Sequence, residues 1–285
     1  MKTPYSVCWN ITSRCNDKCL FCYRERNSSE LDFERQKRII DRIARSGIYK
    51  VTFAGGEPLL VPRIRELILY AKEQGLKVSM TTNGILLEEE MLDFSMGTLD
   101  WLSFSLDGAV TEVQQAMGRN QNHVERTKRL LDRIQERKDR TCRVKINTVV
   151  SQVNKEFIAD IGDFIFQYPI NRWKLFQFVP LRGEAWRNAK DFYISDECFW
   201  DTIDSVKRHL GEREKLLTIS GRENIENAYF VIFPDGAVMI STGLEDRIIG
   251  NALYDDLGEL WQREPFGYQL HEERTRCIRQ IKGDD

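Results

Sequence analysis

The chain has 285 residues, of which 41% are hydrophobic and 30% charged, and its formal net charge is −2. This composition is typical of a globular chain with a sizeable core. The near balance of charge argues against a dedicated nucleic-acid surface, and no apolar run is long enough to span a bilayer. Because the seven cysteines are odd in number and widely spread, they predict no disulfide framework and favour a reducing cytoplasm.

Strand-like and helix-like segments alternate up to about residue 190. A strand over Tyr5–Thr12 leads into a loop with three cysteines, and a helix capped by Asp32 then ends near Gly47. Helices are also predicted around Ile64–Ala71 and Ile158–Phe164. The other predicted strands are "YKVTFAGGEP", "LKVSMTTNG", "DWLSFSLDG", "RVKINTVV" and "RWKLFQFVP".

Six strand–helix units in series indicate parallel strands with right-handed crossovers. Either a barrel or a doubly wound sheet would satisfy this order. The polar, glycine-bearing segments follow the strands at their carboxyl ends, which is where a (β/α) barrel builds its active site. We therefore predict an α/β fold in which residues 1–190 form a partial (β/α)6 TIM-type barrel.

After about residue 190 the pattern changes. Ser195 opens a predicted helix with Trp200, Ile203 and Val206 on its inner face. Residues 228–241 read as a hairpin that turns at "PDG". We expect residues 191–285 to form an α+β extension that covers the barrel opening and belongs to the same structural unit.

Three cysteines, Cys15, Cys19 and Cys22, are spaced C-x-x-x-C-x-x-C in the loop after the first strand. Three thiolates at this spacing suit a 4Fe–4S cluster whose fourth iron is left for a small ligand. A structural zinc site normally has four ligands with a second pair downstream, and a redox dithiol needs only two cysteines. The spacing therefore favours a cluster as the metal centre.

With Phe21 before the last cysteine, the loop resembles that of the radical S-adenosylmethionine (SAM) superfamily. The resemblance continues in "GGEP", which begins at Gly55 and Gly56 after the second strand. In that family this stretch holds the amine of SAM, whose amine and carboxylate chelate the open iron. Glycines allow close backbone approach, and Glu57 can pair with an ammonium. Three strand-end residues are further implied contacts of the cofactor: Thr82, Asn83 and Ser105.

Five further pieces resemble the viperins within that superfamily. They are "YKVTFAGGEP", "GRNQNHVE", "VKINTVV", "RWKLFQF" and "ENAYFVIFPDG", in the viperin order and at similar intervals. Viperins convert nucleoside triphosphates into 3′-deoxy-3′,4′-didehydro nucleotides, which terminate polymerase chains in antiviral defence. The resemblance implies a lyase in which a 5′-deoxyadenosyl radical abstracts the 4′-hydrogen and the 3′-hydroxyl leaves as water.

The resemblance implies that Arg119, Lys145 and Lys174 hold the triphosphate, with Arg172 beside them. A triphosphate carries about four negative charges, so its burial requires several cations. Lysines are seldom buried in strands without a partner, which favours a binding role. The alternative is that each lysine points into solvent.

Lys50 and Asn147 match positions that line the sugar and the reaction centre, and Tyr229 matches a tyrosine placed against the substrate. These three are the implied catalytic residues. Asn147 follows Lys145 by two residues and so shares its strand face. The alternative for Tyr229 is a core position in the hairpin.

The chain also departs from the family. Animal viperins carry an asparagine where this chain has Cys8, and a thiol is a poorer hydrogen-bond partner than an amide. Asn10, on the same strand face, can replace that substrate contact. Tyr23 and Arg24 stand where the family usually has phenylalanine and histidine. The amphipathic N-terminal helix is absent, which fits a microbial form without membrane anchoring.

The implied partners are a nucleoside triphosphate and an electron donor such as flavodoxin or ferredoxin, with no nucleic acid or membrane. One alternative is a radical SAM enzyme that modifies a peptide or a cofactor precursor. Many of these carry further cluster cysteines near the C-terminus, where this chain has only Cys277. Another is a non-catalytic iron–sulfur electron carrier, which would need four protein ligands. The nucleobase, whether of CTP, UTP or GTP, stays open.

Overall fold

The computed structural model describes residues 4–24, 29–224, 228–241, 246–262 and 267–271. The chain forms two compact units. Unit 1 comprises residues 1–13, 27–79 and 223–285, and unit 2 comprises residues 14–26 and 80–222. The cysteine loop therefore belongs to the same unit as the later strands, although it directly follows the first one. The predicted division at residue 190, with the tail over the barrel opening, stays a prediction.

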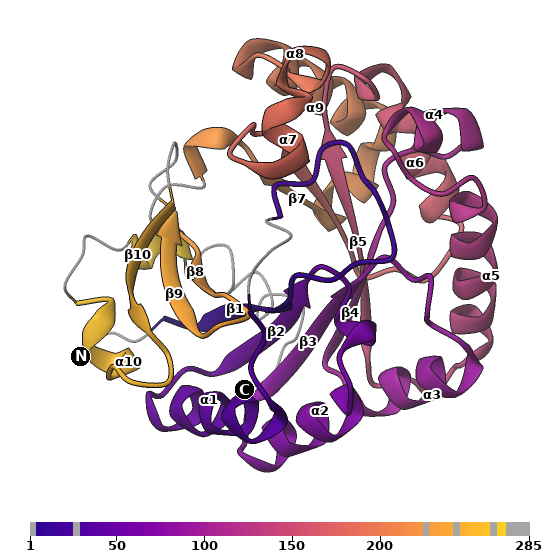
Figure 1. Ribbon diagram of the computed structural model, residues 1–285. Coiled ribbons are helices and arrows are strands. Elements are labelled where there is room, and N and C mark those ends of the chain that lie inside the picture. The colour runs from indigo at the N-terminus through magenta and orange to yellow at the C-terminus, as the bar shows by residue number, and fades with distance from the viewer. Residues whose placement is uncertain (1–3, 25–28, 225–227, 242–245, 263–266, 272–285) are drawn as a thin grey trace. The chain divides into compact units, whose positions relative to one another are not determined.

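Unit 1 contains the first strand–helix units and the C-terminal strands (Figure 1). Its strands follow the order β10-β9-β8-β1-β2-β3. Strand β1 is parallel to β2 and β8, whereas β8, β9 and β10 are antiparallel, which confirms the predicted hairpin. The elements are β1 (Ser6–Thr12), α1 (Phe33–Arg45), β2 (Lys50–Gly55), η1 (Pro58–Leu60), α2 (Ile64–Glu73), the start of β3 (Lys77–Thr82), β8 (Phe230–Ile232), β9 (Ala237–Ser241), β10 (Asp246–Asn251) and α10 (Leu257–Leu260).

Helix α1 shows how the sequence sets these elements. The Asp32 carboxylate accepts a hydrogen bond from the amide of Arg35 at 2.9 Å and caps the helix. Ile39, Ile40 and Ile43 recur at helical spacing and are fully buried. Helices α1 and α2 lie along one side of strands β1 and β2 (Figure 1). The apolar core of unit 1 therefore lies between these helices and the strands.

Unit 2 contains four parallel strands in the order β4-β5-β6-β7. Helices α5 and α6 lie on one side of β5 (Figure 1). The elements are the end of β3, α3 (Glu89–Thr98), β4 (Trp101–Ser105), α4 (Thr111–Ala116), α5 (His123–Glu136), β5 (Arg143–Val150), η2 (Lys155–Phe157), α6 (Ile158–Ile165), β6 (Arg172–Gln177), α7 (Gly183–Arg187), α8 (Ala189–Phe192), α9 (Asp196–Leu210), η3 (Gly211–Leu216), β7 (Leu217–Ser220) and η4 (Arg222–Asn224), which crosses the unit boundary.

Two details of unit 2 differ from the sequence-based expectation. Strand β7 was not predicted, because its four residues are too few to show a clear alternation. Helix α9 begins after the predicted cap Ser195, but its inner face starts at Phe199. Trp200 is only half-buried, because the buried positions follow Phe199 at intervals of three and four residues.

Strands β1 to β6 alternate with helices in chain order, and the segments after β6 are a mixture of helices and strands. The fold is therefore a partial (β/α)6 TIM-type barrel with a C-terminal α+β extension, as predicted. Among the helices that the described residues form, none combines the length and the apolar character needed to cross a bilayer.

We predict that Gly55→Ala destabilises unit 1 more than Gly75→Ala does. Gly55 has φ +124°, and a Cβ there would lie 2.4 Å from the carbonyl oxygen of Thr12. Gly75 has φ +80° but open space around it, so its substitution adds only backbone strain of about 1 kcal/mol. We expect a loss above about 2 kcal/mol for Gly55→Ala in urea-induced unfolding. Equal losses for both variants would contradict the close approach at Gly55.

Candidate active site

The cysteine loop is held by hydrogen bonds to two later segments of unit 2. The amide of Leu20 donates to the carbonyl of Met117 at 3.1 Å, and the amide of Ala185 donates to the carbonyl of Cys22 at 3.0 Å. The side-chain amide of Asn188 donates to the carbonyl of Leu20 at 3.0 Å. The loop conformation is therefore fixed by residues about 100 to 170 positions further along the chain.

The predicted cluster ligands Cys15, Cys19 and Cys22 are all partly exposed on this loop. The amide nitrogen of Asn83 lies 3.7 Å from the sulfur of Cys15, which places one predicted cofactor contact beside a predicted ligand. Within the described residues, no three His, Cys, Asp or Glu side chains converge on a point that would suit a single metal ion. Separated thiolates fit a 4Fe–4S cluster, because each cysteine there binds a different iron.

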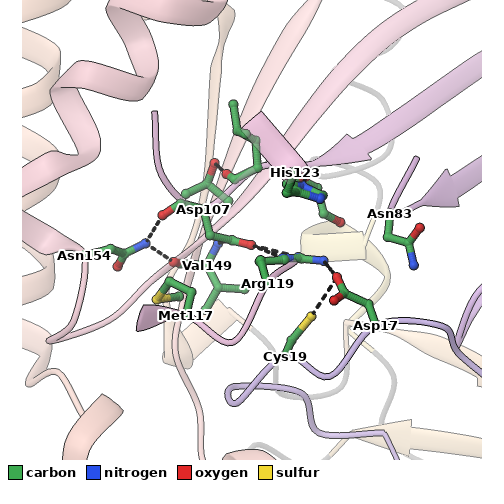
Figure 2. A network of polar contacts seen from close by, with 12 residues as sticks. Asp17, Cys19, Asn83, Asp107, Met117, Arg119, His123, Val149 and Asn154 are labelled. Atoms are coloured by element: carbon green, nitrogen blue, oxygen red, sulfur yellow. Dashed lines mark hydrogen bonds and ion pairs between the residues drawn. The ribbon is translucent and has the colours of Figure 1, made fainter. Parts of the chain in front are cut away.

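A buried ion-pair network joins the loop to the end of β4 (Figure 2). The Arg119 guanidinium donates to the Asp17 carboxylate at 3.0 Å and to the Asp107 carboxylate at 2.7 and 2.9 Å. At most 6% of any of the three side chains is exposed. The guanidinium also lies 5.2 Å from the ring of Phe21, which is itself buried. Arg119 thus gives a charged partner to two carboxylates that would be costly to bury unpaired.

Further hydrogen bonds fix the far side of this network. The second oxygen of the Asp107 carboxylate accepts from the amide of Val149 at 2.8 Å, and the Asn154 side chain donates to the Asp107 carbonyl at 2.9 Å. His123 Nε2 lies 2.7 Å from the Ser105 carbonyl and donates to it. Together these bonds connect the ends of β4 and β5 to the cysteine loop.

Burial changes the acidity of groups in this network. Burial raises the pKa of the Cys19 thiol, and the Arg119 charge opposes that effect. Burial likewise raises the pKa of Asp107, and again Arg119 acts in the opposite direction. Burial and the neighbouring Arg119 charge lower the pKa of His123 to about 4, so His123 is neutral near pH 7. A neutral His123 suits the hydrogen bond that it donates to Ser105.

Strands β5 and β6 bring four of the nine predicted substrate residues together in two rows across one face, and β4 extends one row. The register aligns Ser105, Asn147 and Lys174 in one row. Lys145 and Arg172 form the row next to it, nearer the amino ends of the strands. The opposite face of β5 is fully buried, which confirms that Lys145 and Asn147 share the less buried face.

Asn147 stands out in these rows, because its side-chain carbonyl oxygen is buried without a hydrogen-bond partner among the described residues. An unpaired buried acceptor costs about 1–3 kcal/mol, so a ligand that donates a hydrogen bond to it would gain stability. Arg172 is also buried, with its guanidinium 5.4 Å from the ring of Trp101. The Lys174 ammonium lies 4.4 Å from the ring of Phe176 and is partly exposed. This face of unit 2 is therefore cationic, with an available acceptor.

Four other predicted substrate residues lie in unit 1. Cys8 and Asn10 share one face of β1, and their side chains are 3.9 Å apart. Lys50 pairs in register with Ser6 and is therefore on the same face of the sheet. Tyr229 is half-buried and lies two residues before Val231, the register partner of Cys8. Their roles toward substrate stay predictions.

The predicted SAM-binding turn follows β2 in unit 1. The amide of Gly56 donates to the carbonyl of Thr12 at 2.7 Å, which ties the turn to the end of β1. Glu57 is fully buried, and its carboxylate accepts from the amide of Leu59 at 3.1 Å. In unit 2, the Thr82 hydroxyl accepts from the amide of Gly84 at 3.0 Å. Each of these side chains therefore shapes a strand-end turn, and contact with SAM stays a prediction for them.

The network contains residues that sequence reasoning missed. Asp17 and His123 were not singled out, although Asp17 stands between two cysteines, and Asp107 was noted only as a polar strand end. Arg119 was predicted to bind triphosphate, and that role stays a prediction. The structure pairs its guanidinium with two carboxylates, a contact that linear spacing could not reveal.

Comparison with known proteins agrees with this geometry. The profile of the Radical SAM superfamily matches residues 9–165. An S-adenosylmethionine-dependent nucleotide dehydratase of Flammeovirga pacifica is 30% identical over 260 residues, covering 88% of this chain and 85% of the relative. A protein of the same description from Danio rerio is 31% identical over 244 residues, and the alignment covers 81% of this chain and 65% of the relative.

Solved structures share the fold at low sequence identity. Streptococcus suis SuiB bound to the precursor peptide SuiA superposes with a TM-score of 0.74 at 19% identity, covering 94% of this chain and 66% of that one. The anSMEcpe protein with bound AdoMet gives a TM-score of 0.68 at 17% identity, covering 95% of this chain and 80% of that one. These similarities concern the fold alone.

A radical SAM barrel with three loop cysteines defines the class of protein: an enzyme that uses a 4Fe–4S cluster and SAM. Within that class, the chain belongs to the family of S-adenosylmethionine-dependent nucleotide dehydratases, the viperin-like proteins. Recognition of this family from the sequence is thereby confirmed.

We predict that Arg119→Met lowers the free energy of unfolding by about 3–5 kcal/mol, because it leaves Asp17 and Asp107 buried without a counter-charge. Arg133→Met is the matched control, since Arg133 pairs with Glu89 at an exposed position on α5. We expect a change within about 1 kcal/mol there. Chemical unfolding measures both, and a small loss for Arg119→Met would show that the network does not stabilise unit 2.

We predict that His123 makes the protein less stable as the pH falls from about 6.5 to about 4. In this window the unfolded chain binds a proton at His123, whose pKa near 6.5 in the unfolded state falls to about 4 in the folded state. Proton uptake by the unfolded chain favours unfolding. His123→Gln removes this titration but keeps a donor for the Ser105 carbonyl. The pH dependence of unfolding free energy should be flatter in the variant, and identical profiles would refute the lowered pKa.

Proposed function

We propose that this chain is a radical SAM lyase that converts a nucleoside triphosphate into its 3′-deoxy-3′,4′-didehydro derivative. Its relatives from Flammeovirga pacifica and Danio rerio are named nucleotide dehydratases, which supports a nucleotide as substrate. The observation that carries the proposal is the row of Asn147 and Lys174, next to the row of Lys145 and Arg172. Cations and an available buried acceptor on one face suit a ligand that is anionic at one end and polar at the other.

Cys15, Cys19 and Cys22 would hold the cluster. When bound, the cluster and SAM supply a 5′-deoxyadenosyl radical that takes the 4′-hydrogen of the sugar. Loss of the 3′-hydroxyl as water then requires one proton and a further electron, so each turnover consumes two electrons. The same proposal includes a role in antiviral defence, in which the product terminates the chains that polymerases extend.

The chain's own residues bind and orient the substrate. Lys145, Arg172 and Lys174 hold the phosphates by charge-assisted hydrogen bonds. The buried side-chain oxygen of Asn147 accepts a hydrogen bond from a sugar hydroxyl, which fixes the ring relative to the phosphates. Orientation matters most here, because the radical must take one particular hydrogen from a sugar that has several C–H bonds of similar strength.

Residues of unit 1 complete the proposal. Lys50 and Tyr229 are candidates for delivering the proton to the leaving hydroxyl, and Cys8 and Asn10 are further candidate substrate contacts. We propose a small electron-transfer protein such as flavodoxin or ferredoxin as the electron source. A cytoplasmic location without membrane or nucleic-acid partners is part of the same proposal.

Anaerobic turnover of the cluster-loaded enzyme with CTP, UTP and GTP separately tests this function. Chromatography should show 5′-deoxyadenosine and a nucleotide lighter by one water with at least one of the three. Production of 5′-deoxyadenosine no greater than without substrate would reject the nucleotide assignment. Stimulation by a peptide instead would favour the peptide-modifying alternative.

We predict that Lys174→Met raises the dissociation constant for the triphosphate about 10-fold or more, because a charge-assisted contact contributes about 1.5–3 kcal/mol. The cluster absorbance should not change, since Lys174 is not a ligand candidate. Lys128→Met on α5 is the control, as Lys128 is exposed and lies outside the two rows. Equal affinities for the two variants would remove Lys174 from the triphosphate site.

A further inference from the structure

Large apolar side chains are exposed on and beside the cysteine loop. Leu20 is 36% exposed and Tyr23 53%, and both flank Cys22 in sequence. On helix α7, Trp186 is 67% exposed. We call these residues, with Lys18 and Lys190, the loop–α7 patch. Single exposed apolar residues are ordinary, but a group of them on one surface typically marks an interaction site.

Hydrogen bonds and a ring contact place the two parts of the patch side by side. The amide of Ala185, next to Trp186, donates to the carbonyl of Cys22 at 3.0 Å. Asn188 donates to the carbonyl of Leu20 at 3.0 Å, and the Arg182 guanidinium lies 5.4 Å from the ring of Tyr23. The patch is thus one surface built from two distant stretches of unit 2.

The charge around the patch is positive, although the whole chain is slightly acidic, with 44 acidic against 42 basic residues. Of the acidic side chains in residues 14–24 and 182–193, Asp17 is buried against Arg119, and Glu184 pairs with Arg187 at 2.7 Å. Only Asp191 remains besides these two. The basic residues of the two stretches are Arg14, Lys18, Arg24, Arg182, Arg187 and Lys190.

We propose that the loop–α7 patch is the docking surface for a small acidic protein that carries one electron to the cluster. The inference rests on the cluster chemistry of the proposed function, which needs electrons from outside, and not on the identity of the nucleotide. Electron transfer weakens steeply with distance, so a carrier must dock where the cluster loop reaches the surface. Tyr23 follows the predicted ligand Cys22 directly, and Leu20 follows Cys19.

The composition of the patch fits a transient electron-transfer encounter. Such interfaces are small and bury less than about 1,200 Å² in total. An aromatic centre with a charged rim is the usual anatomy, and Trp186 and Tyr23 provide the centre here. Opposite charge on the partner accelerates the encounter at low salt without requiring high affinity. No bond or proton is exchanged: the carrier loses one electron and the cluster gains it.

The test uses the cluster-loaded enzyme with SAM and, as the probe, a reduced flavodoxin of net negative charge. Stopped-flow absorbance follows cluster reduction in the wild type and in Lys18→Glu/Lys190→Glu. We expect the rate constant of the variant to fall 10-fold or more at low salt, and the wild-type rate to fall as salt rises. Dithionite should reduce both proteins equally, which establishes that cluster and fold are intact.

Lys128→Glu/Lys138→Glu is the matched control, because it changes the net charge equally at exposed positions on and just after α5. Its rate with flavodoxin should stay within about twofold of the wild type. Trp186→Ser should weaken flavodoxin binding, measured by calorimetry, about fivefold, with an unchanged salt dependence of the rate. Equal slowing in both double variants would overturn the proposal, because the change in net charge alone would then explain the slower reduction of the cluster.

Two further outcomes would also overturn it. One is an unchanged flavodoxin rate in Lys18→Glu/Lys190→Glu. The other is that this variant loses binding to anionic vesicles while flavodoxin still reduces its cluster at the wild-type rate. That result would identify the patch as a lipid-facing surface. Because no nucleotide is present, a wrong substrate assignment leaves this test unaffected. Failure of nucleotide turnover with normal cluster reduction would reject the proposed function and keep the docking surface.

Discussion

The structure of unit 2 depends on one arginine between two carboxylates. Arg119 binds Asp17 on the cysteine loop and Asp107 at the end of β4, and all three side chains are buried. Removing Arg119 would leave two carboxylates without a counter-charge in a low-dielectric interior, which is far costlier than losing a surface ion pair. The network therefore fixes where the cysteine loop lies relative to the strands that carry Ser105, Asn147 and the cationic side chains.

Along the parallel strands of unit 2, side chains that pack in the core alternate with side chains that can bind a ligand. One face of β5 carries Val144, Ile146 and other buried residues toward the helices, and the other face carries Lys145 and Asn147. The strand register aligns these residues with residues of β6. Polar side chains of neighbouring strands therefore form rows across the sheet. Stability and ligand recognition therefore depend mainly on different side chains of the same strand.

Much of the architecture could be predicted because its signals are local. The cap at Asp32, the isoleucines of α1 and the alternation of β5 each depend on neighbours a few residues away, and they predicted the elements correctly. The rows across β4 to β6 were only partly predictable, since family resemblance supplied the residues but not their register. The pairing of Arg119 with Asp17 spans 102 residues, and no local periodicity encodes such a contact. Strand β7 was missed because four residues carry too little pattern.

The anchoring of the cysteine loop has a consequence for how the protein is made. The loop leaves the ribosome early, but its partners Met117, Arg119, Ala185 and Asn188 are synthesised much later. A nascent chain that ends before Met117 therefore exposes three unanchored thiols with no counter-charge for Asp17, and one that ends before α7 still lacks the bonds from Ala185 and Asn188. Contacts of such high sequence separation form late in folding, because loop closure must come first. We therefore expect cluster insertion to be a late event, and a truncated chain that ends before α7 to be more exposed to cysteine oxidation.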